Sequence, residues 1–323
     1  MLAPWMVETA AFIVGLLFGS FLNVCIARLP QHKSLSKPRS HCPECGVTIR
    51  WYDNIPVLSF LLLRARCRKC KARISWRYPL VELAVGLWFA HQASTFALVW
   101  SVNHDPEVLS LINSLGNGLG RIRSVPEVFF LFSLPLAILG FLLIGLVVMD
   151  WRTHTLPDAF TLTGTAIGFA LTCEQAMFLA PGEGDIHMHH SLRMSSPGSM
   201  TSQGDVFLTG PEALVLGRLG AIVLAACLVL LIRWVYKKLR DNEGMGLGDA
   251  KLMAMIAAFL GFWPAMLALF VGVVLCAVYA VGLLVRRRAD GQTPLPLGTF
   301  LSIGGLIAAL FGPALIDWYR SLL

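Results

Sequence analysis

Charged residues are scarce in this sequence. Lys, Arg, Asp and Glu make up 14% of the 323 residues, hydrophobic residues make up 56%, and mean hydropathy is +0.68. Soluble globular domains contain about 25% charged residues. The shortage of charge therefore excludes an ordinary soluble domain and predicts an all-α membrane protein with several spans.

The residue sets of several enzyme classes are also missing. The stretch HMHH (187–190) lacks the HExxH spacing of a zinc protease, and the sets used by serine proteases do not occur. The stretch GMGLGD (244–249) has no strand before it and no βαβ unit around it, which disfavours a nucleotide-binding loop. The first apolar run has no basic residues before it and no small-residue cleavage site after it, so we expect a retained span instead of a signal peptide.

Long apolar runs account for most of the chain. All but the sixth are close to the ~20 residues that cross a bilayer, and we expect the sixth to borrow length from the flanking GLGDA and WPAM. The eight predicted spans are 5–26, 80–100, 128–149, 159–180, 214–236, 251–262, 265–285 and 299–318.

Positive charge is concentrated between some of these spans. Residues 28–79 carry 12 of the 26 Lys and Arg residues and only two acids. The positive-inside rule then puts both termini outside and four segments in the cytoplasm. These segments are 28–79, 150–158, 237–250 and 286–298. The net charge of +7 lies beside the spans and not on a separate domain, so it indicates lipid headgroup contact and disfavours nucleic acid.

Four of the eight cysteines form two CxxC pairs with 21 residues between them. Such pairs are typical of four-thiolate zinc sites, because each tight turn presents two sulfurs to one ion. Two disulfides are the alternative, which a reducing cytoplasmic side disfavours. The predicted ligands of a structural zinc ion are Cys42, Cys45, Cys67 and Cys70. The other four cysteines lie in apolar runs and are predicted to be small buried hydrophobes: Cys25, Cys173, Cys227 and Cys276.

Two carboxylates stand at the ends of predicted spans on the same side. Asp150 ends the third span, where the helix dipole disfavours an acid, and Asp249 begins the sixth, where an N-cap role is also possible. Acids at membrane depth usually have a function. We hypothesise an aspartyl dyad with Asp249 as base and Asp150 as acid. Asp158, after a proline, is predicted to cap the fourth span, and it is the next candidate for catalysis.

Neighbouring residues support Asp249 in this hypothesis. Gly244, Gly246 and Gly248 lack a Cβ and would let a substrate strand approach closely. Lys251 either tunes Asp249 electrostatically or is an interfacial lysine that extends to the headgroups.

Four motifs in order resemble the type IV prepilin peptidase family (prepilin leader peptidase/N-methyltransferase). They are GSFLNVCIARLP (19–30), the cysteine segment 41–82, MDWRTHTLPD (149–158) and GMGLGDAKLMA (244–254), the last being the GxGD box. The resemblance implies four parts. These are a first transmembrane helix in 1–27, a cytoplasmic four-cysteine zinc domain in 28–79, a second helix with an outer loop in 80–127, and an aspartyl peptidase domain in 128–323 with an outer-loop insertion at 181–213.

The resemblance also implies an activity. A bacterial inner-membrane enzyme would cut the short basic leader from type IV prepilins or type II secretion pseudopilins after a glycine, using Asp150 and Asp249. It would then methylate the new N-terminus with S-adenosylmethionine. No residue pattern here indicates the S-adenosylmethionine pocket, although Glu82 is a candidate polar contact; a glutamate at the lipid interface is the alternative. The two aspartates are 99 residues apart, and this spacing and the long 101–127 loop depart from the family pattern.

Other classes of protein stay open at this point. A GxGD intramembrane protease of other substrates shares the dyad, and a zinc-containing membrane assembly protein would not need it. A proton-coupled transporter is disfavoured because the charges lie near one membrane face. The oligomeric state, the substrate pilin and the roles of the outer loops do not follow from the sequence.

Overall fold

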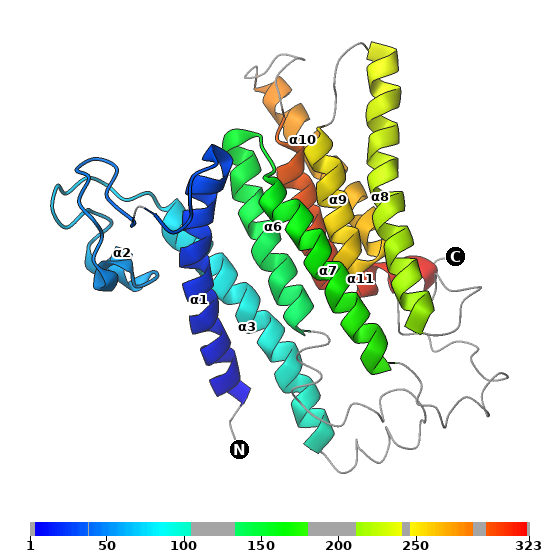
Figure 1. Cartoon of the computed structure of the whole chain (residues 1–323), viewed down its shortest axis with the longest axis horizontal. Coiled ribbons are helices and arrows are strands. Elements are labelled where there is room, and N and C mark those ends of the chain that lie inside the picture. Colours follow the sequence, from blue (N-terminus) through cyan, green and yellow to red (C-terminus); the bar gives the residue numbers. More distant parts are fainter. Residues whose placement is uncertain are drawn as a thin grey trace. The chain divides into compact units, whose positions relative to one another are not determined.

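The computed structural model describes residues 4–37, 39–104, 133–179, 211–240, 246–286 and 295–321 (Figure 1). The described residues form helices and short irregular segments, as the all-α prediction requires. The chain divides into two compact units, Met1–Gly145 and Leu146–Leu323. Most of the predicted outer loops, 105–127 and 181–210, and Gly244 lie outside the described residues.

In the first unit, α1 (Pro4–Arg28) and α3 (Arg77–His104) pack closely against each other. Glycines make this possible: a Cβ on Gly15 would lie 2.8 Å from the Cα of Gly86, and one on Gly19 would lie 2.6 Å from the Cα of Glu82. Glu82 is buried and accepts a 2.8 Å hydrogen bond from the backbone N–H of Val57. Its carboxylate therefore anchors the cysteine segment to α3, so the lipid-interface alternative is wrong.

The cysteine segment contains little regular structure. Its elements are the 3-10 turns η1 (Leu29–Gln31) and η2 (Trp51–Asn54), the short helix α2 (Leu58–Leu62) and two isolated antiparallel bridges. A segment with so few helical residues depends on other links to hold its shape.

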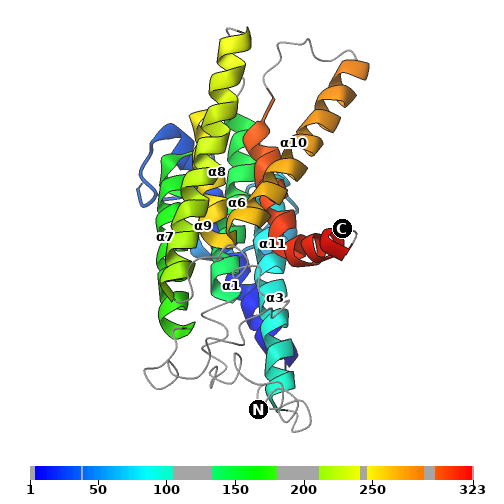
Figure 2. The same ribbon diagram turned by 90° about the vertical axis from the view of Figure 1, so that its right-hand side faces the viewer.

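Helix α6 (Leu134–Thr153) begins in the first unit, and its residues from Leu146 belong to the second. The second unit also contains α7 (Asp158–Leu179), α8 (Pro211–Arg240), α9 (Leu247–Leu260), α10 (Phe262–Val285) and α11 (Leu297–Ser321). The ends of α6, α8 and α10 and the starts of α7, α9 and α11 lie at the same end of this unit (Figures 1 and 2). This alternation brings residues 150–158, 246–250 and 295–298 to one end.

Helix α9 forms the core of the second unit, with α7, α8, α10 and α11 packed around it. Leu252, Met253, Met255 and Ile256 have no exposed surface. The predicted sixth span does extend back through GLGDA, but it does not extend into WPAM. Gly261 adopts φ +88°, a conformation that residues with a Cβ rarely adopt, and there the chain turns from α9 into α10.

Each of the eight predicted spans overlaps a helix in the part of the chain that the structure describes. Among the described residues, α1, α6, α8 and α10 are long and apolar enough to cross a membrane. The prediction that the cysteines in apolar runs are buried holds for Cys25 and Cys276, and Cys173 is half-buried. It is wrong for Cys227, which is exposed on α8, a helix whose apolar surface is largely uncovered.

Candidate active site and metal centre

Asp150 lies in the last turn of α6 and is 5% exposed. The backbone N–H of Thr299 donates to Asp150 Oδ2 over 2.6 Å, and the Thr299 hydroxyl lies 2.9 Å from the same oxygen. These two donors from the first turn of α11 offset the unfavourable position of an acid at the C-terminal end of a helix. A hydrogen-bonded setting, and not the helix end alone, thus explains why α6 accommodates Asp150.

Asp249 lies in the first turn of α9 and is 7% exposed. Gly246 occupies the N-cap position, and its backbone N–H donates to Asp249 Oδ2 over 2.9 Å. The N-cap role considered for Asp249 is therefore wrong by three positions, although its carboxylate still binds the start of the helix, where the dipole favours it.

The fold brings the two carboxylates together. Asp150 and Asp249 lie close enough to interact electrostatically with each other. Both also lie within electrostatic range of the thiol of Cys276 in α10. Among the described residues, no hydrogen bond reaches Oδ1 of either aspartate. Each carboxylate is thus held through its Oδ2 atom.

Leu156, in the connection between α6 and α7, fills the space beside both aspartates. A Cβ on Gly248 would lie 3.1 Å from the Cβ of Leu156, and a Cβ on Gly298 would lie 2.9 Å from Leu156 Cδ1 and 3.0 Å from Asp150 Cγ. The missing Cβ of Gly248 therefore makes room for the side chain of Leu156. The sequence analysis had predicted that it makes room for a substrate strand. Gly246 has no such neighbour, since its closest contact is Asp249 Oδ2 at 3.5 Å.

Lys251 and Asp158 form an ion pair that the sequence did not predict. The Nζ of Lys251 lies 2.6 Å from Asp158 Oδ1, and the side chains are 36% and 60% exposed. Asp158 is in the first turn of α7, so the pair links α7 to α9. Exposed pairs of this kind contribute about 0–1 kcal/mol.

Sequence reasoning missed Thr299, Gly298 and Leu156. None of the three is ionisable, so no search for acids, bases or metal ligands could single them out. One signal was present: Gly298 and Thr299 stand at the start of the last apolar run, on the side where both aspartates were predicted.

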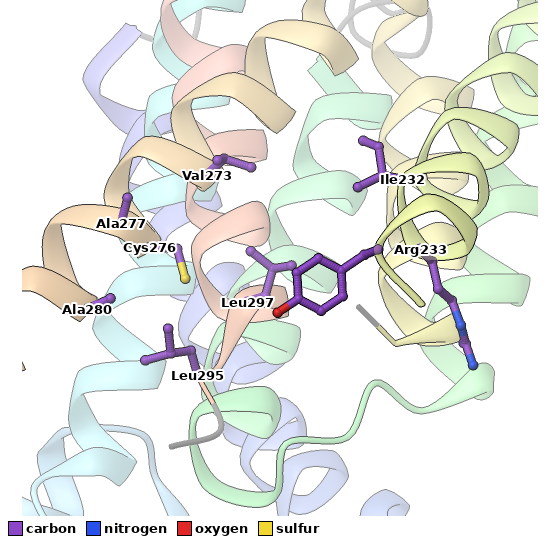
Figure 3. A pocket seen from close by; sticks show the side chains of 9 residues that line it. Ile232, Arg233, Val273, Cys276, Ala277, Ala280, Leu295 and Leu297 are labelled. Carbon is purple, nitrogen blue, oxygen red and sulfur yellow. The ribbon is translucent and has the colours of Figure 1, made fainter. Parts of the chain in front are cut away.

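A cavity of about 360 Å³ lies between α8, α10 and α11 (Figure 3). Its lining residues are Ile232, Arg233, Tyr236, Val273, Cys276, Ala277, Ala280, Leu295 and Leu297.

The four predicted metal ligands gather at one point in the first unit. The two CxxC pairs lie in equivalent loops, closed by the bridges His41–Thr48 and Arg66–Arg73. In each loop the backbone N–H of the first cysteine donates a hydrogen bond to the carbonyl of the residue five positions later. Cys42 donates to Val47 over 2.9 Å, and Cys67 donates to Ala72 over 2.8 Å. Both loops then turn through a residue with positive φ, Gly46 or Lys71. The prediction that each pair sits on a tight turn is confirmed.

The sulfurs have the spacing of a four-thiolate site. All four lie within 4.8 Å of one another, and the Sγ atoms of Cys42 and Cys70 are 3.8 Å apart. A regular tetrahedron with metal–sulfur bonds of about 2.3 Å has sulfurs about 3.8 Å apart, whereas a disulfide needs about 2.05 Å. Backbone N–H groups of Cys70 and Lys69 lower the pKa of the Cys67 thiol to about 6, which favours a thiolate at this position. The backbone N–H of Ala72 lowers the pKa of the Cys70 thiol, but desolvation and hydrogen bonds with the other three sulfurs together outweigh it and raise that pKa.

A second contact links the cysteine loops to η2. The guanidinium of Arg68, between Cys67 and Cys70, binds both carboxylate oxygens of Asp53 at 2.6 to 3.1 Å. This hydrogen bonding lowers the pKa of Asp53. The pair fixes the second loop relative to the rest of the segment.

Two family models match the chain: the bacterial peptidase A24 N-terminal domain over residues 13–96, and the type IV leader peptidase family over residues 206–281. Proteins named prepilin leader peptidase/N-methyltransferase match nearly the whole chain. The one from Aeromonas hydrophila is 30% identical over 98% of this chain and 94% of its own. The one from Pseudomonas putida is 31% identical over 94% of this chain and 90% of its own. This chain belongs to the type IV leader peptidase family.

The family resemblance inferred from the four motifs is thus confirmed. The leader peptidase family model covers Asp249 but not Asp150, and the N-terminal model covers all four clustered cysteines. No solved structure matches this leader peptidase family member.

Proposed function

We propose that the chain is an aspartic peptidase that removes the leader from type IV prepilins or type II secretion pseudopilins. The observation that carries this proposal is the pair of buried aspartates: the backbone N–H of Thr299 in α11 holds Asp150, and the backbone N–H of Gly246 at the N-cap of α9 holds Asp249. The names of the relatives supply the substrate class.

The two carboxylates act as one unit in this mechanism. One is ionised and takes a proton from water as the water attacks the scissile carbonyl, while the other is protonated and donates to that carbonyl oxygen. Thr299 and Gly246 hold the Oδ2 atoms that they bind, which fixes the orientation of each carboxylate. Because such a pair titrates together, the roles of base and acid belong to the dyad until each is tested.

The membrane setting completes the proposal. The apolar runs and the basic residues support eight spans, with residues 28–79, 150–158, 237–250 and 286–298 on the cytoplasmic side. The bacterial inner membrane is what the family resemblance implies. We assign zinc to Cys42, Cys45, Cys67 and Cys70, where it would be structural because the four thiolates leave no position for water.

N-methylation is part of the proposal because the relatives carry both activities in their name. S-adenosylmethionine would supply the methyl group. The sequence candidate for contacting it, Glu82, already accepts the Val57 N–H. We therefore assign no residue of the described part to the methyl donor.

The test uses purified protein in liposomes with a synthetic prepilin that carries its leader. Asp150→Asn and Asp249→Asn should each fold and lose cleavage by at least about a thousandfold, since one half of the dyad cannot move a proton without the other. Asp158→Asn is the matched control, because Asp158 pairs with Lys251 at the surface, and it should retain cleavage. Cleavage by either dyad variant at the wild-type rate would remove that residue from the pair.

A further inference from the structure

Three aromatic side chains from three helices meet near the carboxylate pair and form an aromatic trio: Trp151, Tyr279 and Phe300. The ring centroid of Tyr279, in α10, lies 5.6 Å from that of Trp151 and 5.3 Å from that of Phe300. Trp151 directly follows Asp150 in the last turn of α6. Phe300 directly follows Thr299 in the first turn of α11. The aromatic trio therefore joins the same two helix ends that the hydrogen bonds from Thr299 to Asp150 join.

Both partners of these hydrogen bonds stand at helix termini. Terminal turns fray, because part of their backbone has no partner within the helix. Helix α6 ends at Thr153, and His154 then adopts a positive φ of 50° as the chain leaves the helix. Hydrogen bonds between two terminal turns keep their length only while the turns keep their separation. A contact from a third helix would hold that separation.

Tyr279 is placed to supply such a contact. It lies more than one turn before the end of α10 at Val285, so its backbone is not terminal. It stands three positions after Cys276, and residues three apart share a helix face. The thiol of Cys276 is within electrostatic range of both aspartates, so this face of α10 is the one turned toward the dyad.

The ring contacts have the geometry of stabilising aromatic pairs. Both centroid separations fall within the range of about 4.5–7 Å that such pairs prefer, and the rings are tilted by 59° and 43°. Phe300 is buried and Trp151 is half-exposed. The aromatic trio thus runs from the core of the second unit to its surface.

We propose that Tyr279 is a positioning residue for the dyad: its ring holds the end of α6 against the start of α11 and so keeps the Thr299 donors on Asp150. The inference rests on the proposed function. The contacts described for Tyr279 are made by its ring, so the ring and not the hydroxyl carries the role.

The test measures leader cleavage of the synthetic prepilin by variants of the aromatic trio. Tyr279→Leu removes both ring contacts and should lower kcat about tenfold with KM within about twofold of wild type, since each aromatic pair contributes to holding the helix ends. Trp151→Leu removes one contact and should lower kcat about threefold. Tyr279→Phe keeps both contacts and should restore the wild-type kcat.

A double variant separates positioning from a general loss of stability. If Tyr279 acts by keeping Thr299 on Asp150, the two residues share one effect. Tyr279→Leu combined with Thr299→Val should then lower kcat by clearly less than the product of the two single effects. Falls that multiply would show independent roles and overturn the inference.

The matched control is Phe270→Leu, which removes a 67% exposed ring from the same helix and should leave kcat as in wild type. If Tyr279→Leu fails to fold, Trp151→Leu still provides the test, because its side chain is half-exposed. The inference is also overturned if Tyr279→Phe is as slow as Tyr279→Leu, which would assign the role to the hydroxyl, or if only KM changes, which would mean that the ring touches the substrate.

The two failures differ in the behaviour of wild type. Wild type that cleaves the prepilin, with Tyr279→Leu or Trp151→Leu equally active, refutes the positioning role and leaves the peptidase function standing. Wild type that does not cleave refutes the peptidase function, and the positioning role with it.

Discussion

At the scale of single residues, hydrogen bonds decide how the two acids can sit in an apolar unit. A buried carboxylate without donors would cost several kcal/mol. Asp150 receives two contacts from Thr299, and Asp249 receives one from Gly246. Thr299 is thus a positioning residue: it touches Asp150 and is not expected to touch the substrate.

Thr299→Val should separate the contributions of the two Thr299 groups that bind Asp150, since it removes the hydroxyl donor and keeps the backbone N–H donor. We expect kcat for leader cleavage to fall about tenfold, with KM little changed, because a side-chain hydrogen bond to a charged group contributes about 1.5–3 kcal/mol. Steady-state kinetics with the synthetic prepilin would measure this. Thr163→Val, on the exposed face of α7, is the control. An unchanged pH–rate profile and kcat for Thr299→Val would contradict the positioning role.

At the scale of elements, the cysteine segment is held by cross-links more than by a core. Its helix α2 has five residues, and large apolar side chains such as Trp51, Leu62 and Trp76 are exposed. The two equivalent loops meet through their four sulfurs, and the Asp53–Arg68 pair joins the second loop to η2. A segment that buries so little apolar surface needs a metal or another staple for stability.

We therefore expect about one zinc ion per chain, with loss of the metal unfolding the cysteine segment. Cys67→Ser should lose most of the zinc and make residues 28–79 sensitive to protease, as should treatment with a strong chelator. Atomic emission and limited proteolysis would measure the two effects. Cys227→Ser, an exposed cysteine on α8, should change neither. Full zinc content in Cys67→Ser would show that the cluster is not the metal site.

At the scale of the whole molecule, the distribution of Lys and Arg predicts orientation. The basic segments should face the cytoplasm because transferring them across the membrane is costly. In the second unit, the helix ends that flank the predicted cytoplasmic segments all lie at one end, as this orientation requires.

Reporter fusions would test the orientation and the eight-span count together. Fusions after residues 240 and 286 should report a cytoplasmic location, and a fusion at the C-terminus should report the outer side. Eight crossings place the C-terminus on the same side of the membrane as the N-terminus. A cytoplasmic C-terminus would mean that a helix such as the 14-residue α9, or α11, does not cross.

The sequence by itself determined the family of this protein and the candidate residues of its sites. Acids are so costly in apolar helices, and CxxC spacing is so specific, that Asp150, Asp249 and the four clustered cysteines stand out without coordinates. It also determined the helix positions, because apolar runs fix where helices form. Only the tertiary structure decided what surrounds the acids: Thr299 and Gly298 are distant in sequence from both acids, Leu156 is distant from Asp249, and none of the three is ionisable. It also paired Lys251 with Asp158, ended α9 at Gly261 and formed the cavity beside the dyad, because these depend on how helices pack and not on what any one of them contains.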